Sequence, residues 1–203
     1  MNKQELLSRL TFAKDAAFQA AKLIRQELRR GVTIRHKGPN DIVTQVDLVV
    51  ERYLADAIHV AFPEDQIYGE EMGGDCACAQ RRWIIDPIDG TENFSRGIAE
   101  YAISIGFEST PGELVMGVVY APAMGEMFWA AQGMGAYLND QPIHVSTQND
   151  PQFAVTAVAP PFRRHELTHR YFATVEMLFL NTCDTRNTGS AALHGCYVAC
   201  GRV

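Results

Sequence analysis

The first third of the chain carries hydrophobic residues at spacings of three and four, which is the periodicity of an amphipathic helix. One such run predicts a helix over residues 3–30, ended by Gly31, and a second run predicts a helix that stops before Pro63. A loop at residues 38–40 separates the two helices, and Asp47 falls in the first turn of the second. The apolar positions are Leu6, Leu10, Ala13, Ala17, Ala20, Ile24 and Leu28 in the first run, and Val46, Val50, Leu54, Ala57 and Ala61 in the second.

Beyond Cys78 the pattern changes to short apolar runs separated by turn residues, which is typical of β-strands. Pro111-Gly112 and Asn139-Asp140 are turn dipeptides between strands, so these strands are expected to form one sheet. The predicted strands cover residues 83–85, 102–107, 114–120 and 127–130.

The last quarter of the chain predicts a mixture of strand and helix. A strand is expected at residues 153–158 before the break at Pro160-Pro161, then a helix over residues 164–179. Residues 189–200 are small, apolar and compatible with a helix. Since no internal repeat, low-complexity tract or linker interrupts the sequence, the pattern predicts one layered α/β domain over residues 1–203.

Composition places the chain among globular proteins. Its 203 residues are 47% hydrophobic and 21% charged, enough to bury a substantial core without cross-links. The five cysteines are an odd number and no signal-peptide pattern opens the sequence, so cytoplasm is the expected location. Neither Cys76 with Cys78 nor Cys196 with Cys200 has the spacing of a structural zinc site, so buried thiols are expected.

The charge balance narrows the range of partners. With 18 basic and 24 acidic residues the net charge is −6, whereas a nucleic-acid-binding protein needs a basic face, so no nucleic-acid partner is expected. No apolar run approaches the roughly 18 residues that span a bilayer, so no membrane role is expected. An anionic substrate would therefore need a cation to mediate its binding.

The most informative stretch is WIIDPIDGTENF at residues 83–94, in which a buried strand runs directly into two carboxylates. Asp86 and Asp89 lie three residues apart across Pro87, which stiffens the turn, so both side chains can aim at one point beyond the strand. Gly90 and Thr91 follow with backbone N–H groups where a helical turn can begin, a favourable place for phosphate.

Further carboxylates follow a second extended piece. Glu70 and Glu71 come directly after Ile67-Tyr68, and open sheets bind ligands beyond strand ends, so Glu70 is expected to converge with the two aspartates. Oxygen ligands at this density favour Mg²⁺ or Mn²⁺ over zinc. The alternative for the two aspartates is a capped turn without metal.

A rival pattern lies at residues 165–169, where HELTH matches the H-E-x-x-H motif of zinc proteases. Such a site needs a third ligand, for which His194 or Glu176 would have to serve. Arginines flank the motif, which favours a solvated face and a chance match.

Taken with DIVTQVD at residues 41–47 and Gly189-Ser190-Ala191-Ala192, the GEE and WIIDPIDGTENF stretches resemble the inositol monophosphatase family over essentially the whole chain. The resemblance implies an αβαβα sugar-phosphatase-like sandwich, Mg²⁺-dependent phosphatase activity, inhibition by lithium and a homodimer. It also implies a later Trp-Asp element whose aspartate completes a second metal site. Because the sequence ends at Val203, the domain is expected to be C-terminally incomplete and the activity of this chain reduced.

The resemblance assigns roles to individual residues. One metal ion would be held by Glu70, Asp86 and the carbonyl of Ile88, and a second by Asp86 and Asp89. The Thr91 hydroxyl, oriented by Asp47, would position and deprotonate the attacking water. The phosphate would rest on the amides of Gly90 and Thr91. The substrate-binding residues on the polyol side would be Arg186, Gly189, Ser190 and Ala191.

The resulting expectation is a hydrolase for a small polyol phosphate such as an inositol monophosphate. Histidinol phosphate, fructose bisphosphate and a 3'-phosphoadenosine nucleotide are alternatives that share the mechanism. From another class, a catalytically weak or inactive binding protein remains an alternative, because the last aspartate is not in the sequence.

Overall fold

Two long helices open the computed structural model, which describes residues 1–38, 41–74, 81–162 and 164–203. Helix α1 (Lys3–Arg30) begins with a capping box of Asn2 and Glu5 and ends at Gly31. Helix α2 (Gln45–Ala61) begins with a second capping box, in which Thr44 and Asp47 bond each other's backbone N–H groups. Both helices confirm the predicted ranges.

The main sheet has seven strands in the order β3-β4-β5-β6-β7-β8-β9. Strand β3 runs parallel to β4, and every later pair is antiparallel. The four predicted strands are confirmed, and β8 and β9 flank the Asn139-Asp140 turn, whose residues have φ of 47° and 63°. The strands are β3 (Gln66–Gly69), β4 (Arg82–Asp89), β5 (Ala102–Thr110), β6 (Glu113–Ala121), β7 (Glu126–Ala131), β8 (Gly135–Leu138) and β9 (Gln141–Pro142).

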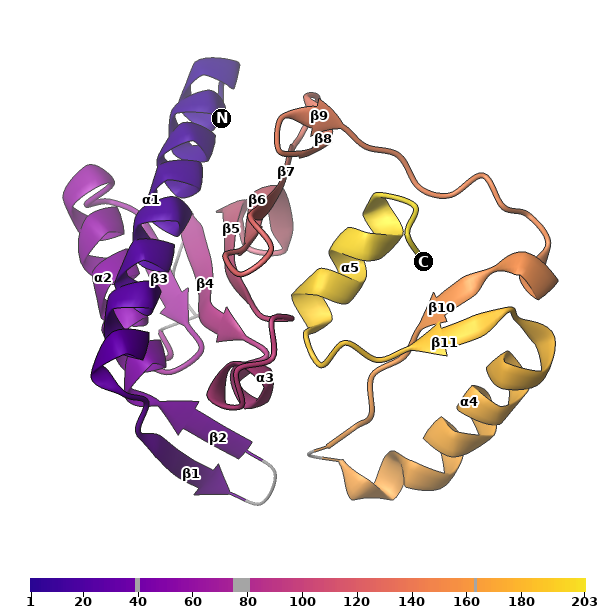
Figure 1. The fold of residues 1–203 in the computed structure, drawn as a ribbon. Helices are drawn as coiled ribbons and strands as arrows, with labels where there is room; N and C mark the ends of the chain where they lie inside the picture. The colour runs from indigo at the N-terminus through magenta and orange to yellow at the C-terminus, as the bar shows by residue number, and fades with distance from the viewer. Residues whose placement is uncertain (39–40, 75–80, 163) are drawn as a thin grey trace.

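The core lies between this sheet and helices α1 and α2, which cover one of its faces (Figure 1). Alanines on α1 are fully buried, so the helix approaches the strands closely, and Trp83 and Phe107 fill the space beside them. At one end Arg9 donates to both oxygens of Asp65, which also accepts from the Trp83 indole at 3.1 Å. This buried ion pair has its hydrogen-bonding groups satisfied inside the apolar core.

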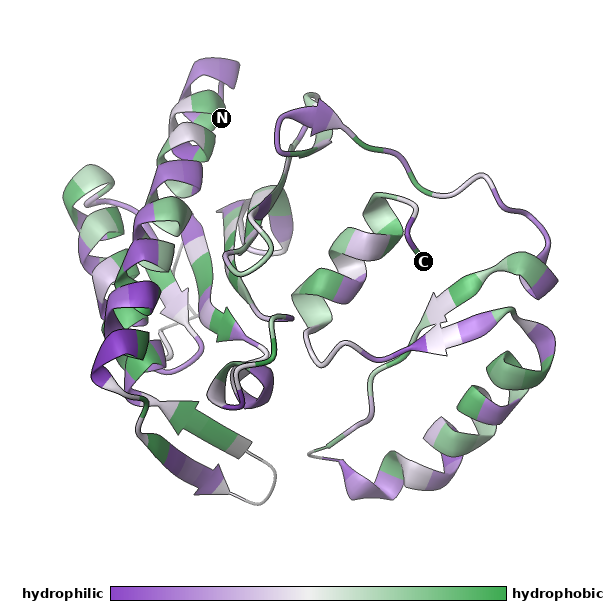
Figure 2. Cartoon of the chain, viewed as in Figure 1, coloured by the Kyte–Doolittle hydropathy of each residue, from purple (hydrophilic) through white to green (hydrophobic). Residues whose placement is uncertain are grey.

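A second, smaller layer follows the main sheet. Strands β10 (Val155–Ala157) and β11 (Asp184–Arg186) form a parallel pair, and helix α4 (Thr168–Asn181) contacts β11. Helix α5 (Ala191–Ala199) lies between the two sheets in Figure 1, and its mostly apolar residues, coloured by hydropathy in Figure 2, suit that position. The layers therefore run helix, sheet, helix, sheet, helix, which confirms the predicted αβαβα sandwich.

Several element boundaries differ from the predictions. Strands β1 (Ile34–Gly38) and β2 (Asp41–Thr44) pair antiparallel in a region where only a loop was expected. The strand at residues 153–158 is shortened to β10, because Asp150 caps a 3₁₀ turn, η1 (Pro151–Phe153). A second 3₁₀ turn, η2 (His165–Leu167), delays the start of α4 to Thr168. A short helix, α3 (Thr91–Ser95), follows β4.

None of the helices in the described part of the chain combines the length and the apolar character needed to cross a membrane. Of the cysteines, Cys76 and Cys78 lie outside the described residues. Cys196 and Cys200 are half-buried where buried thiols were expected, and burial raises the pKa of Cys196 to about 12, so its thiol stays protonated. Cys183, by contrast, is exposed.

Candidate active site

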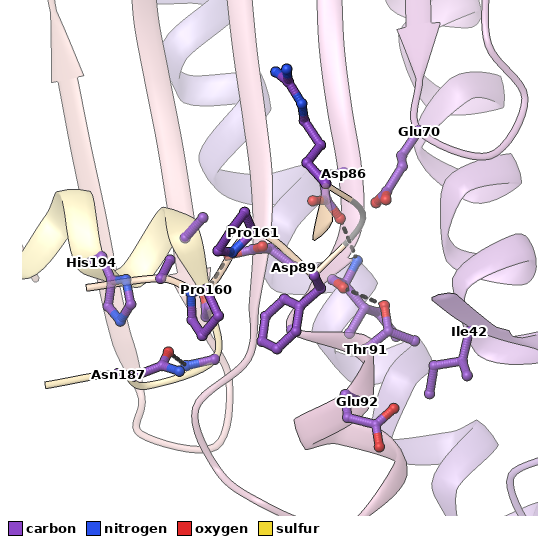
Figure 3. A pocket seen from close by; sticks show the side chains of 18 residues that line it. Ile42, Glu70, Asp86, Asp89, Thr91, Glu92, Pro160, Pro161, Asn187 and His194 are labelled. Carbon is purple, nitrogen blue, oxygen red and sulfur yellow. Dashed lines mark hydrogen bonds between the residues drawn. The ribbon is translucent and has the colours of Figure 1, made fainter. Parts of the chain in front are cut away.

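A cavity of about 460 Å³ is lined by residues that follow the carboxyl ends of two parallel strand pairs, and Figure 3 shows the side chains that line it. Strands β3 and β4 end at Gly69 and Asp89, and β10 and β11 end at Ala157 and Arg186. Ligands of open sheets bind at such ends, so the topology places a site here. The cavity is lined by Ile42, Glu70, Asp86, Ile88, Asp89, Gly90, Thr91, Glu92, Ala159, Pro160, Pro161, Phe162, Arg164, Asn187, Gly189, Ser190, Ala191 and His194.

Glu70 and Asp86 point toward each other from the ends of β3 and β4 (Figure 3). The pKa of Asp86 is raised to about 8. The main cause is burial, and the nearby Glu70 and Asp89 carboxylates and a hydrogen bond with Glu70 contribute to the same rise. The amide of Ile88 donates to Asp86 at 3.0 Å and opposes this shift. Negative charge is thus concentrated at one point, where a cation would relieve it.

Asp89 is oriented by the start of helix α5. Its Oδ2 accepts from the Ser190 hydroxyl and from the amide of Ala192 at 2.7 Å. Ser190 is fully buried and its Oγ also accepts from the amide of Leu193. The resemblance placed Ser190 against the polyol, but in the structure its hydroxyl serves Asp89 and the helix cap.

Thr91 and Asp47 form the expected pair. The Thr91 Oγ1 lies 3.1 Å from Asp47 Oδ1 and 3.0 Å from the carbonyl oxygen of Ile88. Asp47 is buried and accepts through Oδ2 from the backbone N–H and hydroxyl of Thr44. Burial raises the pKa of Asp47, although these hydrogen bonds act in the opposite direction. The pair is therefore held rigidly at the edge of the cavity.

Gly90 permits the tight approach of three segments. Its φ of 94° is in the left-handed region, and a Cβ there would lie 3.0 Å from the carbonyl oxygen of Glu100 and 3.3 Å from that of Gly189. Asn93 joins the same segments, since its Nδ2 donates to the carbonyls of Glu100 at 2.7 Å and Thr188 at 2.6 Å.

The donor chemistry of the cavity fits a hard divalent cation. Glu70, Asp86, Asp89 and the carbonyl of Ile88 offer oxygen ligands only, as Mg²⁺ prefers. As the side chains stand, the described residues include no group of three His, Cys, Asp or Glu arranged so that it could hold a metal ion. Some of these oxygens already have hydrogen-bond partners: Glu70 and Asp86 share a hydrogen bond, and Asp89 Oδ2 accepts from the Ser190 hydroxyl and the Ala192 amide.

Arg186 is the predicted substrate-binding residue that does not line the cavity. It pairs with Asp184 and its guanidinium donates to the carbonyl of Thr185. Alternation along a strand puts residues 184 and 186 on one face, which favours this pairing.

The zinc-protease interpretation finds no support in the geometry. Glu166 pairs with Arg164, and a hydrogen bond from the Arg164 side chain lowers its pKa. His194, a nominated third ligand, accepts from the amide of Thr188 at 2.8 Å. The motif residues 165–169 are divided between η2 and α4.

The sequence did not indicate the wall formed by Pro160, Pro161, Phe162 and Asn187. These residues follow the carboxyl ends of β10 and β11. Only the parallel pairing of those strands would have indicated these residues, and strands of three residues are too short to be recognised from the sequence pattern.

The chain belongs to the inositol monophosphatase family, whose model matches residues 5–203. Nus factor SuhB of Salmonella typhimurium is 38% identical over 197 residues, which are 96% of this chain and 73% of that protein. The extragenic suppressor protein SuhB of Bartonella henselae has a similar structure, with a TM-score of 0.86, 31% identity, and coverage of 97% of this chain and 76% of that one. An IMPase of Thermotoga maritima gives a TM-score of 0.85 and 34% identity, covering 97% of this chain and 74% of that one. Membership in this family indicates phosphatase chemistry.

Proposed function

We propose that the chain is a Mg²⁺-dependent phosphoric monoester hydrolase acting on a small polyol phosphate such as an inositol monophosphate. The observation that carries the proposal is the convergence of Glu70, Asp86 and Asp89 in one cavity with Thr91, whose hydroxyl donates to the buried Asp47. Mg²⁺, when bound, would lower the pKa of the attacking water and offset the negative charge of the phosphoryl oxygens.

The remaining chemistry belongs to the residues of the chain. Asp47 accepts the Thr91 hydroxyl proton, so the Thr91 oxygen can accept a proton from water approaching the phosphorus. Asp47 is buried, and its raised pKa suits it to hold that proton. Gly90 and Thr91 line the cavity at the start of α3, and their amides would hold the phosphate.

The cavity suits a small polar ligand. Its volume of about 460 Å³ falls within the roughly 300–1,000 Å³ typical of small-molecule sites. One wall is apolar, from Pro160 to Phe162, while Asn187 offers an amide and Gly189 and Ala191 border the space for the polyol. Histidinol phosphate, fructose bisphosphate and a 3'-phosphoadenosine nucleotide remain substrates for comparison.

A phosphate-release assay with Mg²⁺ over these substrates tests the proposal. Asp86→Asn should abolish turnover, because it removes the carboxyl group shared by both proposed ion positions. Asp184→Asn is the matched control, since that carboxylate is exposed and paired outside the cavity. Inhibition by lithium is expected for the wild type. Absence of phosphate release from every substrate would refute the proposal.

A binding function is the second candidate, favoured by the name Nus factor that a 38% identical relative carries. If binding is the function, the wild type should release no phosphate, and Asp86→Asn should leave partner binding unchanged. Family resemblance further suggests a homodimer in the cytoplasm, which sedimentation and cell fractionation would test.

A further inference from the structure

Helix α2 carries a second buried carboxylate, Glu51, one turn after Asp47, and the proposed chemistry does not use it. Glu51 is 0% exposed. Its Oε1 accepts from the amide of Glu71 at 2.9 Å, and its Oε2 accepts from the amide of Met72 at 3.1 Å. A carboxylate buried this deeply is stable only with such partners, so the contact is built into the fold.

The two amides belong to the tight turn that carries Glu70. Gly69 and Gly73 close the turn by exchanging backbone hydrogen bonds of 3.1 and 3.0 Å. The amide of Glu70 donates to the carbonyl of Ile85, at 3.2 Å, which ties the turn to β4. The turn is thus fixed by backbone bonds on one side and by Glu51 on the other.

Gly69 provides the space that this contact requires. A Cβ at residue 69 would lie 1.9 Å from Glu51 Oε1 and 2.7 Å from its Cδ. Any larger residue would therefore displace the carboxylate from the amides. Lys37 contacts Glu71 from β1, so the side chain next to Glu70 is also held.

We propose that Glu51 is a positioning residue. By holding the backbone of the turn at residues 69–73, it directs the Glu70 carboxylate toward Asp86. Asp47 and Glu51 lie four residues apart, on one face of α2. One rigid helix therefore sets both sides of the site, Thr91 through Asp47 and Glu70 through Glu51. The relevance of this arrangement to catalysis rests on the proposed function, but its effect on cation binding does not.

Glu51→Gln tests the inference, because it keeps the shape and removes one acceptor. The amide nitrogen of the new side chain would face a backbone N–H, so the turn loses one hydrogen bond and gains a donor–donor repulsion. Mg²⁺ affinity, measured by calorimetry, should fall roughly 10- to 100-fold, as for other groups that orient metal ligands. Glu108→Gln is the control, since Glu108 is also buried but pairs with Arg82 away from the cavity.

A second variant covers the case in which Glu51→Gln does not fold. Gly69→Ala keeps the Glu51 carboxylate in the sequence, but the added methyl group pushes it away from the two amides. This variant should therefore also weaken Mg²⁺ binding. Gly117→Ala is its control, because the nearest atom to a Cβ there is 3.9 Å away. Unchanged Mg²⁺ affinity in a folded Glu51→Gln or Gly69→Ala protein would overturn the inference. A wild-type protein that binds Mg²⁺ without releasing phosphate would refute the proposed function alone.

Discussion

A proton and a Mg²⁺ ion compete for the carboxyl group of Asp86, so the affinity for Mg²⁺ should depend steeply on pH. The pKa of Asp86 in the metal-free protein is about 8, raised mainly by burial and then by Glu70 and Asp89. At pH 6, two units lower, roughly 1% of molecules have the ionised group. The apparent Mg²⁺ affinity at pH 6 should therefore be roughly 100-fold weaker than at pH 9, or about 2.7 kcal/mol.

The same shift fixes the sign of the effect on stability. Because the folded pKa of Asp86 lies above its ordinary value of 3.8, the metal-free folded state holds a proton that the unfolded state has lost. Its contribution to stability is present below about pH 4 and is lost as the pH rises toward about 8. Stabilisation by Mg²⁺ should increase over that range.

Calorimetric titration of Mg²⁺ between pH 6 and 9, in buffers of different ionisation enthalpy, measures both the affinity and the protons released. About one proton should leave at pH 7 and almost none at pH 9. Asp184→Asn should keep this profile, because its carboxylate is exposed and paired with Arg186. An affinity constant within twofold across the range, with no proton release, would refute the reasoning.

Three further substitutions separate the roles of other groups. Thr91→Ala should lower kcat about 10²- to 10⁴-fold with little change in Mg²⁺ affinity, and Thr91→Ser should restore much of the rate; equal losses of rate and affinity would contradict a role in positioning water. Ser190→Ala removes the hydroxyl that donates to Asp89 and caps α5. Thermal unfolding should show a loss of about 1 kcal/mol in stability, together with weaker Mg²⁺ binding. An unchanged Tm would argue against this role of the Ser190 hydroxyl. Arg9→Met leaves Asp65 buried without its ion partner, which should cost about 3–5 kcal/mol in urea unfolding, and a loss below 1 kcal/mol would show that the pair contributes little.

The main sheet and its helices could be predicted from the sequence because each element buries one continuous face. Most positions of the α1 and α2 patterns lie in the core, but the helix ends do not: Leu28 and Ala61 are exposed, and Ile58 is buried where Ala57 was expected. The carboxylates of β4 could be placed because a buried strand leads directly into them. The convergence of Glu70 with Asp86, expected from strand ends, is observed.

The remaining elements lacked such a signal. Four of the five β1 residues are exposed, so the pair of β1 and β2 shows no buried alternation at its first strand. Strands β10 and β11 have three residues each and pair across a long connection, and only that pairing brings residues 159–162 to the cavity. Arg186 is close in sequence to Ser190, but its neighbour on the strand face is Asp184.

The capping of α5 by Asp89 also constrains how the protein is made on the ribosome. The two ends of that contact, Asp89 and Ala192, are 103 residues apart. At about 5–20 residues per second, the ribosome completes the acidic cluster roughly 5–20 s before it delivers the helix that orients Asp89. For that interval the acidic residues at the ends of β3 and β4 exist without the α5 amide that holds Asp89 in the finished protein.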